Sequence, residues 1–176
     1  MSSHEQVYEV GDWLIHINYG IGQVIGIEEK KLFDEKKQFY RVRAQENNGV
    51  FWIPVEKAAK NGRVRPIVQQ KRLEEALAIL RKSPRMMSEE NKVRKERIQE
   101  ARSAGKLLPI ARLVRDLSAR QSTNSLTQVE TKALEFFKNR LISEWATRLE
   151  IPAHSVRQHL HNILNESLSQ PTRPAA

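Results

Sequence analysis

The chain has 176 residues, with 39% hydrophobic and 29% charged residues, no cysteine and a formal net charge of +9. These values are typical of a globular protein with one domain or two small ones. They exclude disulfides and thiolate metal sites, and no apolar run approaches the ~18 residues that a membrane-spanning helix needs.

The first 66 residues predict a small β domain. Residues 9–28 contain an apolar strand, a turn with Gly20 and Gly22, and a second apolar strand. Glycine allows the backbone angles of such a tight reversal. Many short strands in so few residues are typical of a strongly bent barrel of Tudor or SH3 type. Further strands are expected at about residues 38–44, 50–55 and 63–67.

From about residue 69 the spacing of apolar residues changes to that of helices. Ser88 is expected to cap the second helix, and Gly105 to end it. Thr127 and Glu130 have the spacing of a capping box at the start of the fourth. Five helices are expected: from about residue 69 to Ser83-Pro84, from 88 to 104, around the apolar stripe at 110–117, from 127 past 145, and from 152 onward.

These elements predict an α+β chain in which a small N-terminal Tudor/SH3-like β barrel precedes an all-α domain of about five helices. We expect the β domain over residues 1–66 and the helical domain over 67–170. The segment from Gln170 is expected to fray, with a disordered tail over 171–176.

The helix expected over residues 88–104 carries a face of like charges. At about 100° per residue, four cations of this region fall in one narrow sector, here called the basic face: Lys92, Lys95, Arg102 and Lys106. Lys106 lies just past Gly105, so its place in the sector assumes that the turn continues. Like charges at helical spacing repel one another by a few tenths of a kcal/mol per pair. Such a face is favourable where an anion lies along it. It can also be an ordinary solvated face, partly neutralised by Glu96 and Glu100.

The charge distribution supports the first interpretation. Residues 67–124 hold fourteen basic and seven acidic residues, whereas residues 1–66 hold ten and nine and residues 125–176 hold six and five. A localised excess indicates a surface that faces a polyanion. Contacts of this kind with phosphates supply affinity and salt sensitivity, not sequence recognition.

The sequence lacks the motifs of catalysis and metal binding. His159 and His161 lie two apart on a predicted helix and therefore face different ways. The sequence contains neither a phosphate-binding loop nor a nucleophile elbow. We therefore expect a protein that is not an enzyme and that uses neither a cofactor nor a metal.

Two parts of the chain resemble a known family. The segments GDWLIHINYGIGQVIGIEEK, KQFYRV and FWIPV, in that order, resemble the RNA-polymerase-interacting module of CarD-like bacterial transcription regulators, a module also found in transcription-repair coupling factors. LVRDL at residues 113–117, followed by Leu126-Thr127-x-x-Glu130, resembles the helical DNA-facing domain of the same family. Ile17 stands where many members carry proline. The resemblance extends from about Val10 to about Leu149.

The resemblance implies a transcription regulator with two partners. Its β domain would bind the β subunit of RNA polymerase by strand addition, and its basic helical domain would contact the backbone of upstream promoter DNA. Lys30 and Trp52 fall where the family has interface side chains, often arginines. Trp52 could instead pack against the helical domain.

One position departs from the family pattern. Members that stabilise open promoters carry a tryptophan at the start of the basic helix, which wedges into the minor groove. The equivalent residue here is Asn91. Met86 or Met87 could act as a substitute wedge, or could fill gaps in the core. We therefore expect binding to the DNA backbone with weak or altered stabilisation of the upstream fork, where the promoter duplex opens.

Two other functions remain open on the sequence. The first is a polymerase-independent nucleic-acid-binding protein, and the second is a structural adaptor whose last helices bind another protein. The first residues contain no basic segment followed by an apolar core, so we expect no secretory signal. We expect a cytoplasmic, nucleoid-associated monomer that does not bind membranes.

Overall fold

A computed structural model describes residues 8–32, 35–60 and 62–174 and divides the chain into two units. Residues 1–67 form the β unit and residues 68–176 the helical unit. None of the described helices combines the length and the apolar composition that crossing a bilayer would take.

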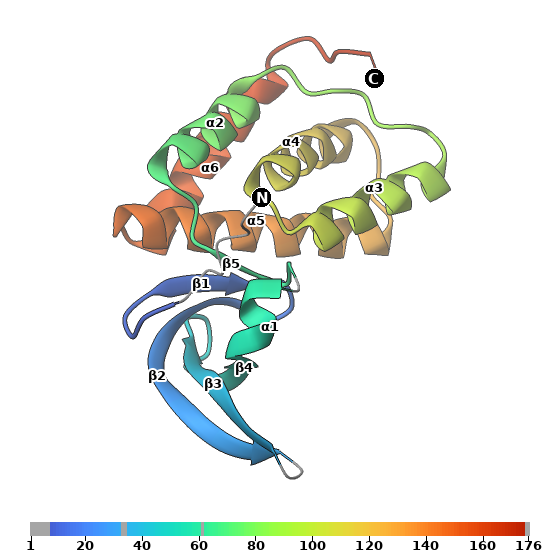
Figure 1. Ribbon diagram of the computed structural model, residues 1–176. Coiled ribbons are helices and arrows are strands. Elements are labelled where there is room, and N and C mark those ends of the chain that lie inside the picture. Colours follow the sequence, from blue (N-terminus) through green and yellow to red (C-terminus); the bar gives the residue numbers. More distant parts are fainter. Residues whose placement is uncertain (1–7, 33–34, 61, 175–176) are drawn as a thin grey trace, which may run out of the picture. The chain divides into compact units, whose positions relative to one another are not determined.

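The β unit is built on a five-stranded antiparallel sheet in the order β4-β3-β2-β1-β5 (Figure 1). Its described elements are β1 (Trp13–His16), β2 (Gly20–Leu32), β3 (Glu35–Ala44), β4 (Val50–Pro54), α1 (Val55–Lys60) and β5 (Val64–Pro66). The pairing of β2 with β3 shifts register between Val24 and Gly26, and such a bulge bends a strand. Figure 1 shows the resulting curve of β2. The core of the unit includes Leu14, Tyr40 and Val42.

The sequence predicted the β class of this unit but not all of its elements. Strands β2 and β3 pair as far as Leu32 and Glu35, well beyond the predicted apolar pieces. Their outer halves are rich in lysine and glutamate, so hydrophobic alternation could not reveal them. Val55 begins helix α1 where the sequence suggested only the end of a strand.

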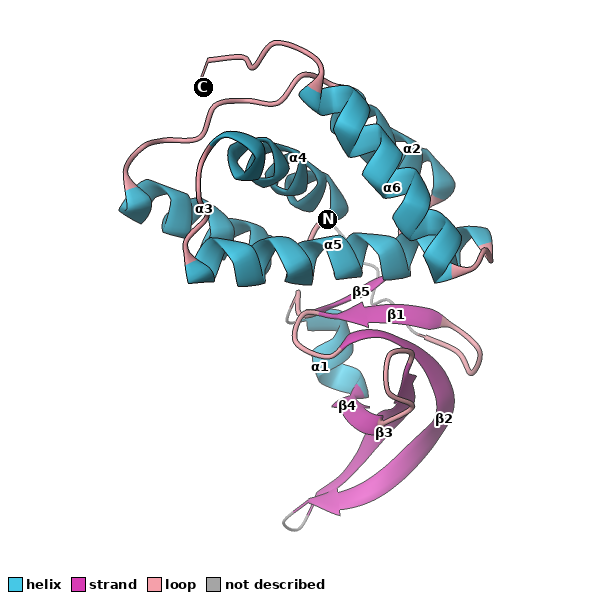
Figure 2. Cartoon of the chain, turned by 180° about the vertical axis from the view of Figure 1, so that it is seen from behind, coloured by secondary structure: helices cyan, strands magenta, loops and turns pink. Residues whose placement is uncertain are grey.

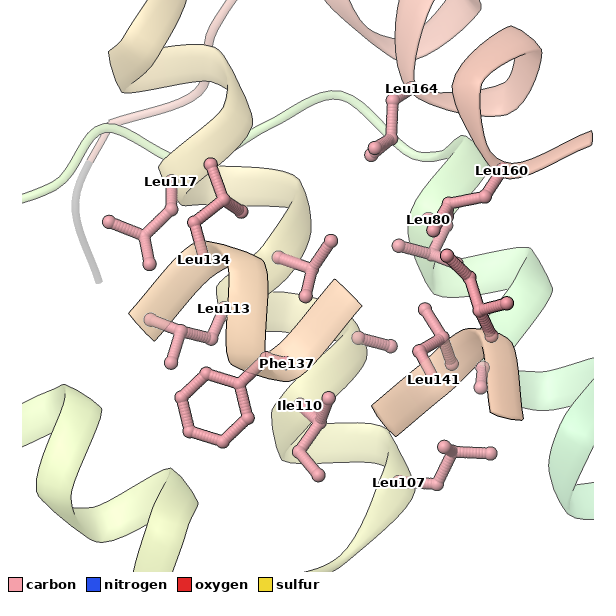
Figure 3. Packing of buried hydrophobic residues seen from close by; sticks show 14 of the residues in the cluster. Leu80, Leu107, Ile110, Leu113, Leu117, Leu134, Phe137, Leu141, Leu160 and Leu164 are labelled. Atoms are coloured by element: carbon pink, nitrogen blue, oxygen red, sulfur yellow. The ribbon is translucent and has the colours of Figure 1, made fainter. Parts of the chain in front are cut away.

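The helical unit contains five described helices, of which one is central. They are α2 (Gln70–Arg81), α3 (Asn91–Ala104), α4 (Leu107–Thr123), α5 (Gln128–Leu149) and α6 (Ala153–Leu168). Helix α4 packs against each of the other four, as the views from the two sides show (Figures 1 and 2). Leu113 and Leu117 of α4 lie beside Leu134 and Phe137 of α5 in the apolar core (Figure 3). The predicted α+β class, with helices after the sheet, is confirmed.

The helix ends agree with the sequence in two cases and differ in one. Thr127 and Glu130 form the predicted capping box at the start of α5. Gly105 ends α3 in the left-handed conformation with φ of 59°, which glycine adopts at little cost. The prediction for Ser88 is wrong, because α3 begins at Asn91 with Glu90 as its N-cap. The Ser88 hydroxyl instead accepts a hydrogen bond from the Glu90 amide, 3.1 Å away.

The segment after α6 is held in place. The Gln170 side chain donates to the Arg81 carbonyl at 2.9 Å. The Arg173 amide donates to the Pro84 carbonyl, and the Met86 amide donates to the Arg173 carbonyl, both at 2.8 Å. The predicted fraying is therefore wrong for Gln170 and Arg173, because their polar groups find partners at the end of α2 and on the connection between α2 and α3. Residues 175–176 of the predicted tail lie outside the described residues.

Candidate functional site

Strand β4 forms one edge of the sheet. Within the described residues it pairs with β3 alone, from Arg43 opposite Val50 to Phe39 opposite Pro54. Phe51 and Ile53 turn toward the interior, whereas Val50 and Trp52 are each 42% exposed. This alternation follows from the two-residue period of a strand. Among the described strands, β4 is therefore paired on one side only, and Val50 and Trp52 are exposed along it.

The two residues singled out in the β domain, Lys30 and Trp52, lie in contact. The ammonium nitrogen of Lys30 lies 3.5 Å from the centre of the Trp52 ring, a cation–π geometry. The Trp52 indole nitrogen donates to Glu28 at 2.9 Å, and Arg41 donates to the other oxygen of Glu28 at the same distance. We call these four residues the Trp52 cluster.

The Trp52 cluster keeps its carboxylate ionised. The hydrogen bond from Trp52 is the largest influence and lowers the pKa of Glu28; partial desolvation raises it, and the charges of Arg41 and Lys30 lower it further. An ionised Glu28 holds the indole and the guanidinium in fixed positions. The cluster therefore presents an oriented indole beside the β4 edge.

Three residues of the basic face, Lys92, Lys95 and Arg102, lie on α3. Lys106 does not, because α3 ends at Ala104, Gly105 takes the left-handed conformation and Lys106 is the N-cap of α4. The assumption that the helical turn continues to Lys106 is therefore wrong.

All four residues of the basic face are exposed. The Lys92 ammonium lies 4.0 Å from Glu96, with 87% of its side chain exposed, so this pair neutralises little. Arg102 differs from the lysines, because its guanidinium carbon lies 4.6 Å from the centre of the Phe136 ring on α5.

The inner face of α3 is attached by ion pairs. The Arg94 side chain, buried to 5% exposure, pairs with Glu130 of α5 and donates to the carbonyls of Ser88 and Glu89 at 2.8 and 2.7 Å. Arg97 pairs with Asp116 of α4 at 2.5 Å. These pairs fix the rotation of α3 about its axis and so direct the basic face outward.

Glu130 is the most strongly constrained of these groups. Burial, the largest single influence, favours its neutral form, but the hydrogen bonds from Arg94 and Thr127 and the charge of Arg94 outweigh it and lower the pKa of Glu130. Its carboxylate accepts from the Thr127 amide at 2.8 Å while it pairs with Arg94. The sequence predicted the bond to Thr127 but not the bond to Arg94, which is 36 residues away.

The two methionines proposed as wedges, which precede α3, differ in exposure. Met87 is buried, with 5% exposure, and belongs to the apolar core. Met86 is 56% exposed. Asn91, at the position of the family tryptophan, is exposed at the first turn of α3. Of these three residues, Met87 therefore fills the core, whereas Met86 and Asn91 are open to solvent.

The described residues contain no group of three or more His, Cys, Asp or Glu side chains that could hold a metal ion. His16 has a structural use: its ring nitrogen accepts from the amides of Asn18 and Tyr19 at 3.1 and 3.2 Å. The ring also stacks on Tyr19, with centres 4.6 Å apart. This histidine shapes the turn between β1 and β2.

The chain is similar to known proteins over most of its length. Residues 8–68 match the family model described as "CarD-like/TRCF RID domain", and residues 75–161 match the model "CarD, C-terminal domain". The chain is also 28% identical over 142 residues to the protein of Bacillus subtilis (strain 168) named "Putative transcription factor YdeB". That match covers 78% of this chain and 90% of the relative.

Proposed function

Because the chain belongs to the CarD-like family of transcription regulators, we propose that it binds the β subunit of RNA polymerase through its β unit and upstream promoter DNA through its helical unit. The family consists of transcription factors, not enzymes, and its N-terminal domain is an RNA-polymerase-interacting domain. The observation that carries the proposal is the match of both domain models in chain order, over residues 8–68 and 75–161.

Polymerase binding is assigned to the β4 edge. A strand of the polymerase β subunit would pair with the open side of β4, which adds main-chain hydrogen bonds without a change in either fold. Side chains then supply specificity. Lys30 and Trp52 lie together beside this edge, and Glu28 holds the indole in place. The open edge and the oriented side chains together support strand addition here.

DNA binding is assigned to the basic face. Lys92, Lys95 and Arg102 project from a helix whose opposite side is tied down by Arg94 and Arg97, which supports their placement for phosphates, and Lys106 lies just past the end of this helix. Phosphate contacts give affinity that falls with salt. Docking on polymerase raises the local concentration of DNA, so a weak interaction suffices. Specificity would come from the polymerase position and DNA shape.

The proposal is tested with purified bacterial RNA polymerase and the full chain. We expect the two to form a complex on gel filtration, and Trp52→Ala to weaken it. Val10→Ala, a change at another exposed apolar residue of the β unit, is the matched control and should bind normally. A polymerase-independent nucleic-acid-binding protein predicts retention of DNA or RNA with no polymerase complex. That result would contradict the proposal.

A substitution of Asn91 tests whether residue 91 can act as a wedge at the upstream fork. We expect Asn91→Trp to lengthen the lifetime of the open promoter complex, because a large apolar side chain at this position can insert between unstacked bases. Asn91→Ala is the control and should leave the lifetime unchanged. The lifetime is measured by competitor challenge of preformed complexes. An unchanged lifetime with tryptophan would show that residue 91 does not reach the fork.

A further inference from the structure

The helical unit contains a cavity of about 640 Å³ lined by seven cationic side chains and one carboxylate. It lies between the end of α2, the connection before α3, helices α3 and α4, and the segment after α6. No residue of the basic face lines it. The cavity is therefore a second cationic feature of this unit, concave where the basic face is convex.

Two of the cations that line the cavity form ion pairs with Asp116. This carboxylate has no exposed surface and pairs with Arg97 at 2.5 Å and Arg115 at 2.7 Å. It also accepts the Arg85 amide at 2.9 Å. One carboxylate thus serves two guanidiniums. The pairs fix Arg97 and Arg115 but leave their combined charge only half neutralised.

Among the described residues, Arg94 pairs with Glu130, whereas the other four cations of the cavity make no ion pair. Within the described part of the chain, the side chains of Lys82, Arg85 and Arg112 make no ion pair or hydrogen bond. Arg173 donates twice to the Ser83 carbonyl, at 3.2 and 2.7 Å, which is a neutral acceptor. Cations from the connection after α2, from α4 and from the segment after α6 thus converge on one space. Their mutual repulsion is relieved where several negative charges enter together.

Apolar side chains also line the cavity. Met86 and Val93 line it with 56% and 43% of their surface exposed, and Ile79 lies among the lining residues. A phosphate group gains nothing from apolar lining residues, whereas a flat heterocycle gains contact with them. Methionine adapts to planar rings through favourable sulfur contacts. The volume falls within the about 300–1,000 Å³ of pockets for small molecules.

We propose that this cavity binds a nucleoside polyphosphate. Its phosphates would pair with Arg85, Arg112 and Arg173, since arginine binds phosphate oxygens in bidentate fashion, and its base would lie against Met86 and Val93. Duplex DNA fits these features less well, because its bases are stacked away from a protein that holds the backbone. The assignment is independent of the proposed binding to polymerase.

The test is isothermal titration of the full chain with ATP, GTP and inorganic tripolyphosphate in near-physiological salt without magnesium. We expect saturable binding of at least one nucleotide with one site per chain, tighter than tripolyphosphate. Arg112→Ala and Arg85→Ala should each weaken it about tenfold, the equivalent of one charge-assisted hydrogen bond. Lys95→Ala removes an equal charge from the basic face and should leave nucleotide affinity unchanged.

Three results would overturn the assignment. The first is the absence of saturable nucleotide binding at millimolar concentration. The second is equal affinity for tripolyphosphate and both nucleotides, which would remove any role for the apolar lining residues. The third is an equal loss of nucleotide affinity in Lys95→Ala and Arg112→Ala, which would mean that the affinity depends only on the net charge of the protein. If nucleotides do not bind but Arg112→Ala weakens duplex DNA binding, the cavity belongs to the DNA surface.

Discussion

Glu130 connects two helices through one carboxylate. It completes the capping box of α5 through Thr127 and neutralises the buried guanidinium of Arg94 on α3. A guanidinium this deeply buried is costly without its partner. Glu130 therefore stabilises the start of α5 and the position of the basic face together.

Replacement of Glu130 by glutamine should destabilise the protein strongly. Glu130→Gln leaves Arg94 charged and buried, and loss of one partner of such a pair costs about 3–5 kcal/mol. The free energy of unfolding is measured by urea denaturation. Glu96→Gln breaks the exposed pair with Lys92 and should cost at most about 1 kcal/mol. Equal effects of the two changes would contradict the role given to the buried pair.

The pKa of Glu130 predicts a pH dependence. Because the pKa is lowered in the folded state from its ordinary value of 4.5, its contribution to stability is fully present above pH 4.5. That contribution is lost as the pH falls through the lowered folded-state value. We expect the free energy of unfolding to fall with acidification across this range. The fall should be shallower in Glu130→Gln, and an identical acid profile would exclude Glu130 as a source.

Two glycines of β2 differ in the space around them. A Cβ at Gly22 would lie 2.5 Å from a methyl carbon of Val42 and 3.0 Å from the Arg43 carbonyl oxygen. At Gly26 the nearest atom would be 3.7 Å away, on the Arg41 side chain. We expect Gly22→Ala to cost about 1–3 kcal/mol through overpacking, and Gly26→Ala less than about 1 kcal/mol. Thermal unfolding would show a lower midpoint for Gly22→Ala; the reverse order would contradict this packing.

At the scale of elements, α3 is a helix held by charges on its inner face. Few apolar residues support it, and Arg94 and Arg97 attach it to α5 and α4. Its outer face is then free to carry repelling cations.

The basic face should determine the salt dependence of DNA binding. We expect Lys92→Ala and Lys95→Ala each to weaken binding to duplex DNA and to reduce the slope of log affinity against log salt by about 0.9 for each phosphate that is no longer neutralised. Lys71→Ala, an exposed change on α2, is the control. Fluorescence anisotropy over a salt series measures the slope. An unchanged slope in both variants would remove the basic face from the DNA interface.

The sequence predicted those structural features whose signal comes from residues close together in the chain. Thr127 with Glu130 and the glycine at 105 carry their signals locally, and the structure confirms both. Helix α1 and the outer halves of β2 and β3 were missed because their residues are charged and follow no apolar period. Helical spacing predicted that Lys92, Lys95 and Arg102 share one side of α3, but Lys106 lies past the end of that helix, at the N-cap of α4. The contact of Lys30 with Trp52, and the cavity around Asp116, depend on tertiary packing and could not be read from sequence.

At the scale of the whole molecule, the proposed contacts lie on separate units of the chain. Trp52→Ala should therefore weaken the polymerase complex and leave binding to duplex DNA alone unchanged. Lys92→Ala combined with Lys95→Ala should do the reverse. Gel filtration with polymerase and anisotropy with DNA measure the two effects separately. Loss of both activities in either variant would show that the surfaces are not independent.

The bonds of Gln170 and Arg173 also bear on how the chain folds during synthesis. The Arg173 side chain reaches a carbonyl 90 positions earlier, so the connection between α2 and α3 leaves the ribosome long before its partners exist. The pairings of the sheet, by contrast, lie within the first 67 residues, and N-terminal domains generally fold first during translation. A nascent chain can thus complete its sheet before the hydrogen bonds of Gln170 and Arg173 can form in the helical unit.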